Sequence, residues 1–164
     1  MADAVLKTPP TLPAQHKPGN PAAYEADFFA WTEAQAKLLA EGRFDKLDCE
    51  NLIEEILSMG RSDKRGMKSH FDNLLMHLLK YRYQPEYRST SWRGSIREAR
   101  KQIDMILKDS PSLRRHLVEY AALPKTYKDA LIQAADETGL PISTFPPELP
   151  FTLEEMLDEE FWPE

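Results

Sequence analysis

One apolar register runs through residues 47–85, LDCENLIEEILSMGRSDKRGMKSHFDNLLMHLLKYRYQP. Its members recur every three or four residues, with Asp63 taking one apolar position, and they are Leu52, Ile56, Met59, Met67, Phe71, Leu74 and Leu78. This spacing is typical of one face of an α-helix. It predicts one long helix over about residues 49–83, which would extend roughly 50 Å at a rise of about 1.5 Å per residue.

Both ends of this helix carry local signals. Asp48 can cap the N-terminus, while Leu47 and Leu52 occupy the two positions of a hydrophobic staple. Pro85 ends the helix, because the residue before a proline avoids the α conformation.

The glycines inside the register leave an alternative open. Gly60 and Gly66 each weaken a helix interior by about 1 kcal/mol relative to alanine. In the alternative the segment forms two helices that are broken at Gly60, and Ser62 caps the second. The register holds its phase across both glycines, so we favour the single helix.

Shorter registers on both sides predict further helices. The first would begin at Asn20-Pro21, where a cap precedes a proline at the first helical position, and it would close at Gly42. Its inward residues would be Phe28, Trp31, Gln35 and Leu38. The later helices are marked by Trp92, Ile96, Ala99, Ile103 and Ile106; by Leu113, Leu117 and Tyr120; by Leu131 and Ala134; and by the capping box of Thr152 and Glu155.

No run of alternating polar and apolar residues indicates a strand, so the sequence predicts an all-α fold. We expect a helical bundle of about five to six helices with one long central helix. An extended C-terminal tail would carry a short final helix. Residues 1–19 are predicted to be a disordered N-terminal tail, and residues 20–164 a single helical domain.

Composition narrows the function classes. No apolar run approaches the roughly 18 residues that a membrane span needs. Cys49 is the only cysteine, and no cysteine and histidine share zinc-ligand spacing. We therefore expect a cytoplasmic protein with no metal, no cofactor and no membrane association.

The net charge of −6 hides a strong segregation of charge along the chain. Residues 61–115 contain 14 Lys or Arg against 6 Asp or Glu, whereas the rest contains 7 against 21. A basic middle within an acidic frame has two explanations. Either the oppositely charged parts neutralise each other, or the basic part faces an anionic partner.

Basic and aromatic side chains crowd residues 77–100, HLLKYRYQPEYRSTSWRGSIREAR. Guanidinium groups beside aromatic rings suit phosphate contact and base stacking, which is the RNA-binding interpretation. The candidate binding residues are His77, Lys80, Arg88, Trp92, Arg93 and Arg97.

The same residues also fit a packed corner, and we favour that interpretation. Trp92 heads an apolar register, so it is expected in the core. The arginines would pair with the acidic first helices, with the C-terminal residues 153–160 (LEEMLDEE) or with another subunit, or would be solvated. A histidine beside an apolar face, such as His77, is more often a core residue than a catalyst. Glu55 would need a basic partner, with Arg97 or His77 as candidates.

One catalytic pattern occurs in RGMKSH, where Arg65 and His70 are separated by four residues. The pair resembles the motif of the HEPN ribonucleases, small α-helical proteins that cleave RNA, often as dimers. The resemblance implies that Arg65 would steady the phosphate and that His70 would act as acid or base. The motif departs from that family in its position along the chain and in the glycine that follows Arg65.

Four segments together resemble the bacterial family catalogued as domain of unknown function 29. They are LDCENLIEEI (47–56), HLLKYRYQPEYRSTSWRGSIREAR (77–100), SPSL (110–113) and PFTLEEMLDEEFWP (150–163). The resemblance covers nearly the whole chain from Tyr24 onward. It implies a compact all-α protein and supplies no activity and no site residues.

The leading hypothesis is a non-catalytic helical protein that acts through protein–protein or homo-oligomeric contacts. It rests on the lack of a strong catalytic or cofactor motif. The alternative is RNA binding, or a HEPN-like ribonuclease activity that uses the basic middle segment.

Overall fold

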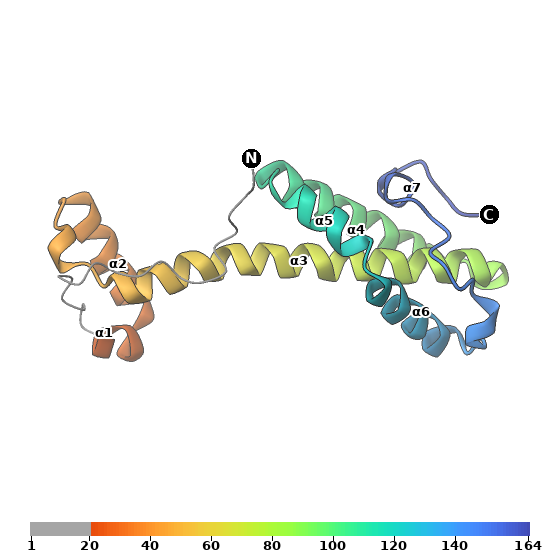
Figure 1. The fold of residues 1–164 in the computed structure, drawn as a ribbon, viewed down its shortest axis with the longest axis horizontal. Coiled ribbons are helices and arrows are strands. Elements are labelled where there is room, and N and C mark those ends of the chain that lie inside the picture. Colours follow the sequence, from red (N-terminus) through yellow and green to blue (C-terminus); the bar gives the residue numbers. More distant parts are fainter. Residues whose placement is uncertain (1–20) are drawn as a thin grey trace. The chain divides into compact units, whose positions relative to one another are not determined.

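The computed structural model describes residues 21–164, so the predicted tail at residues 1–19 lies outside the described residues. Across the described part, the secondary structure consists of seven α-helices and three short 3₁₀ helices, with no strand. The all-α prediction is confirmed (Figure 1). The chain falls into two compact units, one up to Arg61 and one from Ser62 onward. The prediction of a single helical domain over residues 20–164 stays a prediction.

The N-terminal unit contains α1 (Pro21–Ala26), α2 (Phe28–Ala40) and the 3₁₀ helix η1 (Phe44–Lys46). The prediction of one helix up to Gly42 is wrong in one respect, because the helix is interrupted at Asp27. The Asp27 carboxylate accepts a hydrogen bond from the backbone N–H of Ala30 at 3.0 Å and caps α2, with a φ of −155°. A short polar side chain that bonds the backbone locally favours a cap over a helix interior. Gly42 closes α2 with a left-handed φ of 68°, as expected.

Helix α3 (Cys49–Tyr83) is continuous over 35 residues, which resolves the alternative of two helices in favour of one. Gly60 and Gly66 both lie inside it. The α3 helix ends before Pro85, which begins the 3₁₀ helix η2 (Pro85–Tyr87). A single hydrophobic register therefore outweighs the cost of two interior glycines.

The C-terminal unit contains α4 (Thr90–Asp109), α5 (Leu113–Ala121), α6 (Pro124–Thr138), the 3₁₀ helix η3 (Ile142–Thr144) and α7 (Leu153–Leu157). Local signals set these ends. Ser89 caps α4 by accepting from the backbone N–H of Trp92, and Gly139 ends α6 with a φ of 70°. Thr152 and Glu155 form both hydrogen bonds of the predicted capping box. The short final helix is thus confirmed.

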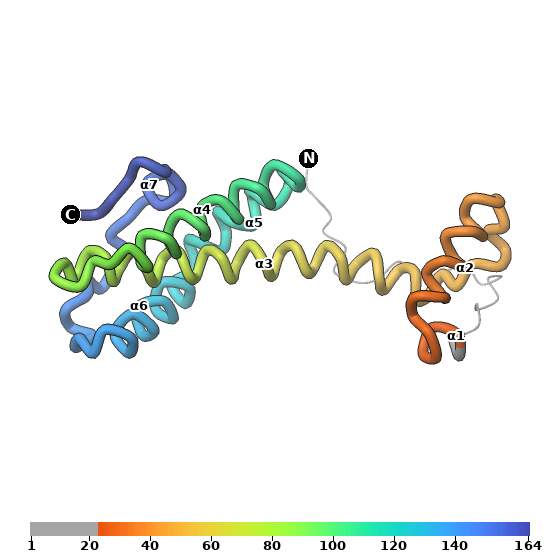
Figure 2. Tube along the Cα trace, turned by 180° about the vertical axis from the view of Figure 1, so that it is seen from behind, coloured from red at the N-terminus to blue at the C-terminus, as the bar shows by residue number. Residues whose placement is uncertain are grey.

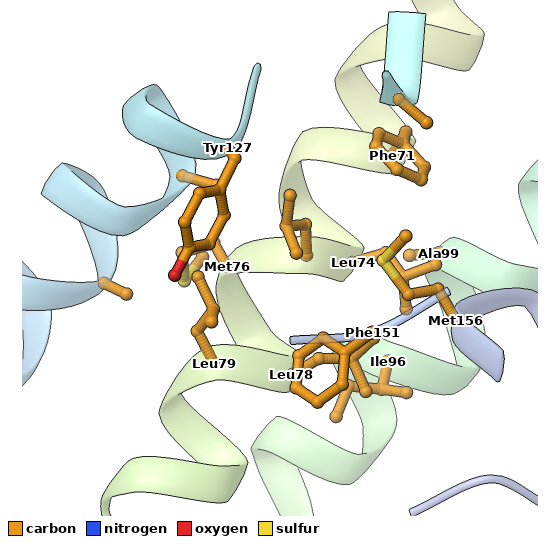
Figure 3. Packing of buried hydrophobic residues seen from close by; sticks show 14 of the residues in the cluster. Phe71, Leu74, Met76, Leu78, Leu79, Ile96, Ala99, Tyr127, Phe151 and Met156 are labelled. Atoms are coloured by element: carbon orange, nitrogen blue, oxygen red, sulfur yellow. The ribbon is translucent and has the colours of Figure 1, made fainter. Parts of the chain in front are cut away.

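The core of this unit forms around the second half of α3. Helices α4 and α6 border that half on opposite sides in Figures 1 and 2. Among the fully buried side chains are Phe71, Leu74, Leu78, Ile96, Ile103, Leu117 and Met156. Phe151 and Met156 come from the C-terminal segment and pack beside Leu78, Ile96 and Ala99 (Figure 3). The segment after α6 is therefore part of the core.

Candidate interaction surfaces

The N-terminal unit leaves six of its large apolar side chains exposed to solvent. In the described part of this unit only Trp31 and Leu47 are buried hydrophobic residues. Six others are between 47% and 72% exposed, namely Phe28, Phe29, Leu39, Phe44, Ile56 and Met59. Where exposed apolar side chains form a contiguous patch, the patch marks a contact site more often than a solvated face.

A buried polar network holds this unit together around Asp48, which is 1% exposed. Its Oδ2 accepts hydrogen bonds from the indole N–H of Trp31 at 3.1 Å and from the side-chain amide of Asn51 at 2.8 Å. The backbone N–H of Asp48 donates to Oε1 of Gln35 at 2.8 Å. The inward position predicted for Gln35 is confirmed. Asp48 was expected only as a helix cap, and its role as a buried hydrogen-bond acceptor was not predicted.

The expectation of a basic partner for Glu55 was wrong. The hydroxyl of Tyr24 donates to Oε1 of Glu55 at 2.5 Å, in place of the basic partner that the sequence indicated. The same hydrogen bond raises the pKa of Tyr24. A phenol can donate a hydrogen bond to a half-buried carboxylate, but it leaves no charge pattern in the sequence.

The basic stretch of α4 holds the C-terminal segment of the chain. Arg100 is 3% exposed, and it donates from Nε to the carbonyl of Met156 and from Nη2 to the carbonyl of Phe161, both at 2.8 Å. Its Nη1 donates to the carbonyl of Glu159 at 3.4 Å. All three of these acceptors in the C-terminal segment are backbone carbonyl oxygens.

Trp162 completes the contact between α4 and the tail. Its ring centre lies 5.8 Å from the guanidinium carbon of Arg93 and 5.5 Å from those of Arg97 and Arg100. It also lies 5.4 Å from the ring centre of Tyr81. Arginines around an indole face gain cation–π attraction, and Arg93 and Arg97 also remain exposed to solvent, whereas Arg100 is buried.

Arg88 and Arg93 converge on Tyr81 near the end of α3. Arg88 donates from Nε to the Tyr81 carbonyl at 2.8 Å and from Nη2 to the carbonyl of Pro163 at 3.3 Å. Arg93 donates from Nη2 to the Tyr81 hydroxyl at 3.1 Å. Both side chains remain partly exposed to solvent.

A second polar cluster surrounds Lys80 of α3, whose ammonium contacts Glu137 of α6 and Trp92 of α4, while His77 lies about one turn earlier on α3. The buried Lys80 binds Oε2 of Glu137 at 2.5 Å, and its ammonium lies 4.6 Å from the ring centre of the half-buried Trp92. His77 carries a buried Nδ1 without a hydrogen-bond partner. Burial lowers the pKa of His77, and the charge of Lys80 lowers it further, while Glu137 opposes both.

A family model described as Domain of unknown function DUF29 matches residues 23–162 of the chain. The chain belongs to this family. No curated protein and no solved structure matches it. The family match confirms the resemblance that the sequence indicated. The match spans both units of this DUF29 chain and contains every candidate residue, but the family description assigns no activity.

The proposed ribonuclease pair of this DUF29 chain lies on one helix without a shared face. Arg65 is exposed and His70 is half-buried on α3. Five residues along a helix turn a side chain by about 140°. The two side chains therefore leave the helix in divergent directions, and the ribonuclease hypothesis stays a prediction.

Three further features of this DUF29 chain concern metal ions, membranes and small apolar ligands. Among residues 21–164 no cluster of three or more His, Cys, Asp or Glu side chains is placed to hold a metal ion. In the same range no helix combines the length and the hydrophobicity that crossing a membrane requires. An apolar hollow of about 530 Å³ lies between α6 and residues 142–149, and Leu123, Tyr127, Ile142 and Leu149 are among the residues that line it.

Proposed function

We propose that the protein is a non-catalytic cytoplasmic module that acts by binding another protein chain through its N-terminal unit. The observation that carries this proposal is the imbalance between two buried and six exposed large hydrophobic residues in the described part of that unit. Burial of apolar surface stabilises a complex by about 25 cal/mol per Å² before the costs of association are subtracted. A unit with this much uncovered apolar surface gains from a protein partner.

The polar interior of the unit supports the same conclusion. Asp48, Gln35 and Asn51 form a defined hydrogen-bond network, so the unit has a specified arrangement around Trp31. An ordered scaffold that presents apolar side chains to solvent is the usual form of a protein-binding site.

In-cell photo-crosslinking would test the proposal. A photo-reactive amino acid at Ile56 should give a discrete adduct with a protein chain, whereas the same amino acid at Glu54 should give little. Glu54 is the matched control, because it is exposed on the same helix and points about 160° away from Ile56. Equal labelling from both positions, or none from either, would count against the proposal.

RNA binding is the second candidate, and the partial exposure of Arg88, Arg93 and Arg97 supports it. The test is fluorescence anisotropy with RNA at low and moderate salt. Binding through phosphates should fall steeply with salt, and replacing all three arginines by alanine should flatten that dependence. Salt-insensitive or absent binding would leave the arginines with the role of holding the tail.

A further inference from the structure

We propose that a hollow between α4 and the C-terminal segment binds a small ligand through a phosphate group. The hollow has a volume of about 330 Å³ and lies wholly within the C-terminal unit. The residues that line it are Arg97, Arg100, Lys101, Glu159, Glu160 and Trp162. This inference goes beyond the proposed protein-binding function, which concerns the N-terminal unit.

Arg100 supplies a buried positive charge to this hollow. It is only 3% exposed, and a guanidinium carries five N–H groups. Three of its hydrogen bonds go to backbone carbonyls, so two N–H groups have no acceptor among residues 21–164. Within the same residues, Arg100 forms no ion pair with a carboxylate. Because a buried charge is normally paired, an anion in the hollow would complete the contacts of this side chain.

The carboxylates near Arg100 do not offset its burial. Burial lowers the pKa of Arg100, and the charges of Asp158 and Glu159 act in the opposite direction without restoring it. An anion in direct contact with the guanidinium would favour its charged form more strongly than these two carboxylates do.

Arg97 and Lys101 bring two further positive charges to the same hollow. Both are exposed, and neither forms an ion pair with another described residue. They lie four residues apart on α4, and Arg100 is three residues from Arg97, so the three charges share one side of the helix. Like charges at these spacings repel each other. A bound anion would neutralise that repulsion.

Trp162 holds two of these guanidinium groups in place. The centre of its ring lies 5.5 Å from the guanidinium carbon of Arg97 and 5.5 Å from that of Arg100. The segment that carries this ring runs beside α4 in both views of the chain (Figures 1 and 2). The positive charges are therefore positioned before a ligand arrives, which reduces the entropic cost of binding.

The arrangement fits a phosphate group better than a carboxylate. Arginine binds both kinds of oxyanion through paired N–H groups. A phosphate monoester carries a charge of about −1.5 to −2 and three acceptor oxygens, so it can accept from all three cations at once. Small-molecule sites in proteins span about 300–1,000 Å³, and the hollow lies at the lower end of this range. Its size therefore favours a small phosphomonoester.

Glu159 and Glu160 place two negative charges at the same hollow. Both are exposed, and among the described residues neither forms an ion pair with the three cations. They oppose the binding of an anion, so their removal should strengthen it. Glu159→Gln and Glu160→Gln should each tighten phosphate binding by up to about fivefold, the effect of one charge about 4 Å away in water.

Isothermal titration calorimetry of the full-length protein tests the proposal. The probes are inorganic phosphate, glycerol phosphate and acetate at constant ionic strength. We expect both phosphates to bind, and acetate to bind about tenfold more weakly or less. Replacing Arg97 and Lys101 together by glutamine should weaken phosphate binding by about tenfold or more. Both positions are exposed, so circular dichroism should show the helix content of the wild type.

The matched control replaces Arg114 and Lys128 together by glutamine. These are exposed cations of the same unit that do not line the hollow, and the control variant has the same net charge as the first. It should bind phosphate as the wild type does. Equal losses in the two variants would reveal a general effect of charge and would overturn the proposal. A wild-type protein that binds neither phosphate would overturn it as well.

A competition with RNA separates this site from the RNA-binding candidate, with which it shares Arg97. Binding of glycerol phosphate that an RNA oligonucleotide does not displace supports a separate small-ligand site. RNA that binds through Arg97 and Lys101 while glycerol phosphate does not bind would assign the hollow to RNA and overturn the proposal. Crosslinking from Ile56 tests the protein-binding function independently, because that residue lies in the other unit.

Discussion

Arg100 and Trp162 are in contact, with the guanidinium carbon 5.5 Å from the centre of the indole ring. The same guanidinium donates to three backbone carbonyls of the C-terminal segment. One buried arginine therefore binds both the backbone and the terminal aromatic side chain of that segment. Because Phe151 and Met156 of this segment belong to the core, the contact links the tail to the stability of the C-terminal unit.

We expect Arg100→Ala to destabilise the protein by about 2–4 kcal/mol, because it leaves buried carbonyls without donors. Arg100→Lys should recover only part of this loss, since an ammonium cannot reproduce the planar fork of donors. Urea unfolding followed by circular dichroism measures the change. Limited proteolysis should cut the variant first in the C-terminal segment.

Arg97→Ala provides the matched control for that prediction. Arg97 is exposed and approaches the same ring at 5.5 Å, so its removal should cost about 1 kcal/mol or less. Equal losses at the two positions would show that the carbonyl contacts of Arg100 contribute nothing.

These contacts also show where sequence reasoning stops. The periodicity of α3, the end at Pro85 and the Thr152–Glu155 capping box depend on local spacing, so they could be predicted. The role of Arg100 could not, because its acceptors are backbone carbonyls, which every residue carries. A basic stripe in the sequence is the same whether it faces phosphate, carboxylate or carbonyl oxygen.

The N-terminal unit shows a related limit. Asp27 divides the first predicted helix because one side-chain hydrogen bond competes with the helix, a balance that residue spacing does not reveal. The exposure of Ile56 and Met59 was equally hidden, since they continue the register that is buried from Met67 onward. Periodicity identifies a face that can be buried, and only the structure shows how much of it is covered.

The network around Asp48 yields a second prediction. Asp48→Ala should destabilise the N-terminal unit by about 1–3 kcal/mol, because Trp31 and Asn51 lose their acceptor in a buried place. Near-ultraviolet circular dichroism reports the environment of Trp31. Asp45→Ala, at an exposed position of η1, is the control and should change stability by no more than about 0.5 kcal/mol. A neutral effect of Asp48→Ala would show that water satisfies these donors.

His77 should make stability depend on pH in the mildly acidic range. Its folded pKa is lowered from 6.5, so the unfolded chain takes up a proton at a pH where the folded chain does not. The stability it contributes is present above pH 6.5 and is lost as the pH falls through the folded pKa. Lys80 and Glu137 are the charged groups that act on it. His77→Gln should make the unfolding free energy depend less on pH below neutrality. If the dependence on pH is unchanged in this variant, it belongs to other groups.

The ion pair of Lys80 and Glu137 gives the last prediction. Glu137→Gln keeps the shape of the side chain but leaves the buried Lys80 without its counter-charge. Because Glu137 is about 40% exposed, solvent screens the pair, and we expect a loss of about 1–2 kcal/mol. Chemical unfolding at neutral pH measures it.

The pH dependence of this pair has a definite sign. The hydrogen bond from Lys80 lowers the pKa of Glu137 below 4.5, although burial acts in the opposite direction. The stability it contributes is present above pH 4.5 and is lost as the pH falls through the folded pKa, so wild type and Glu137→Gln should converge in acid. Adding Lys80→Met to Glu137→Gln removes the unpaired charge and should restore part of the stability at neutral pH. A double variant less stable than Glu137→Gln alone would show that the contact of Lys80 with Trp92 matters more than its charge pairing.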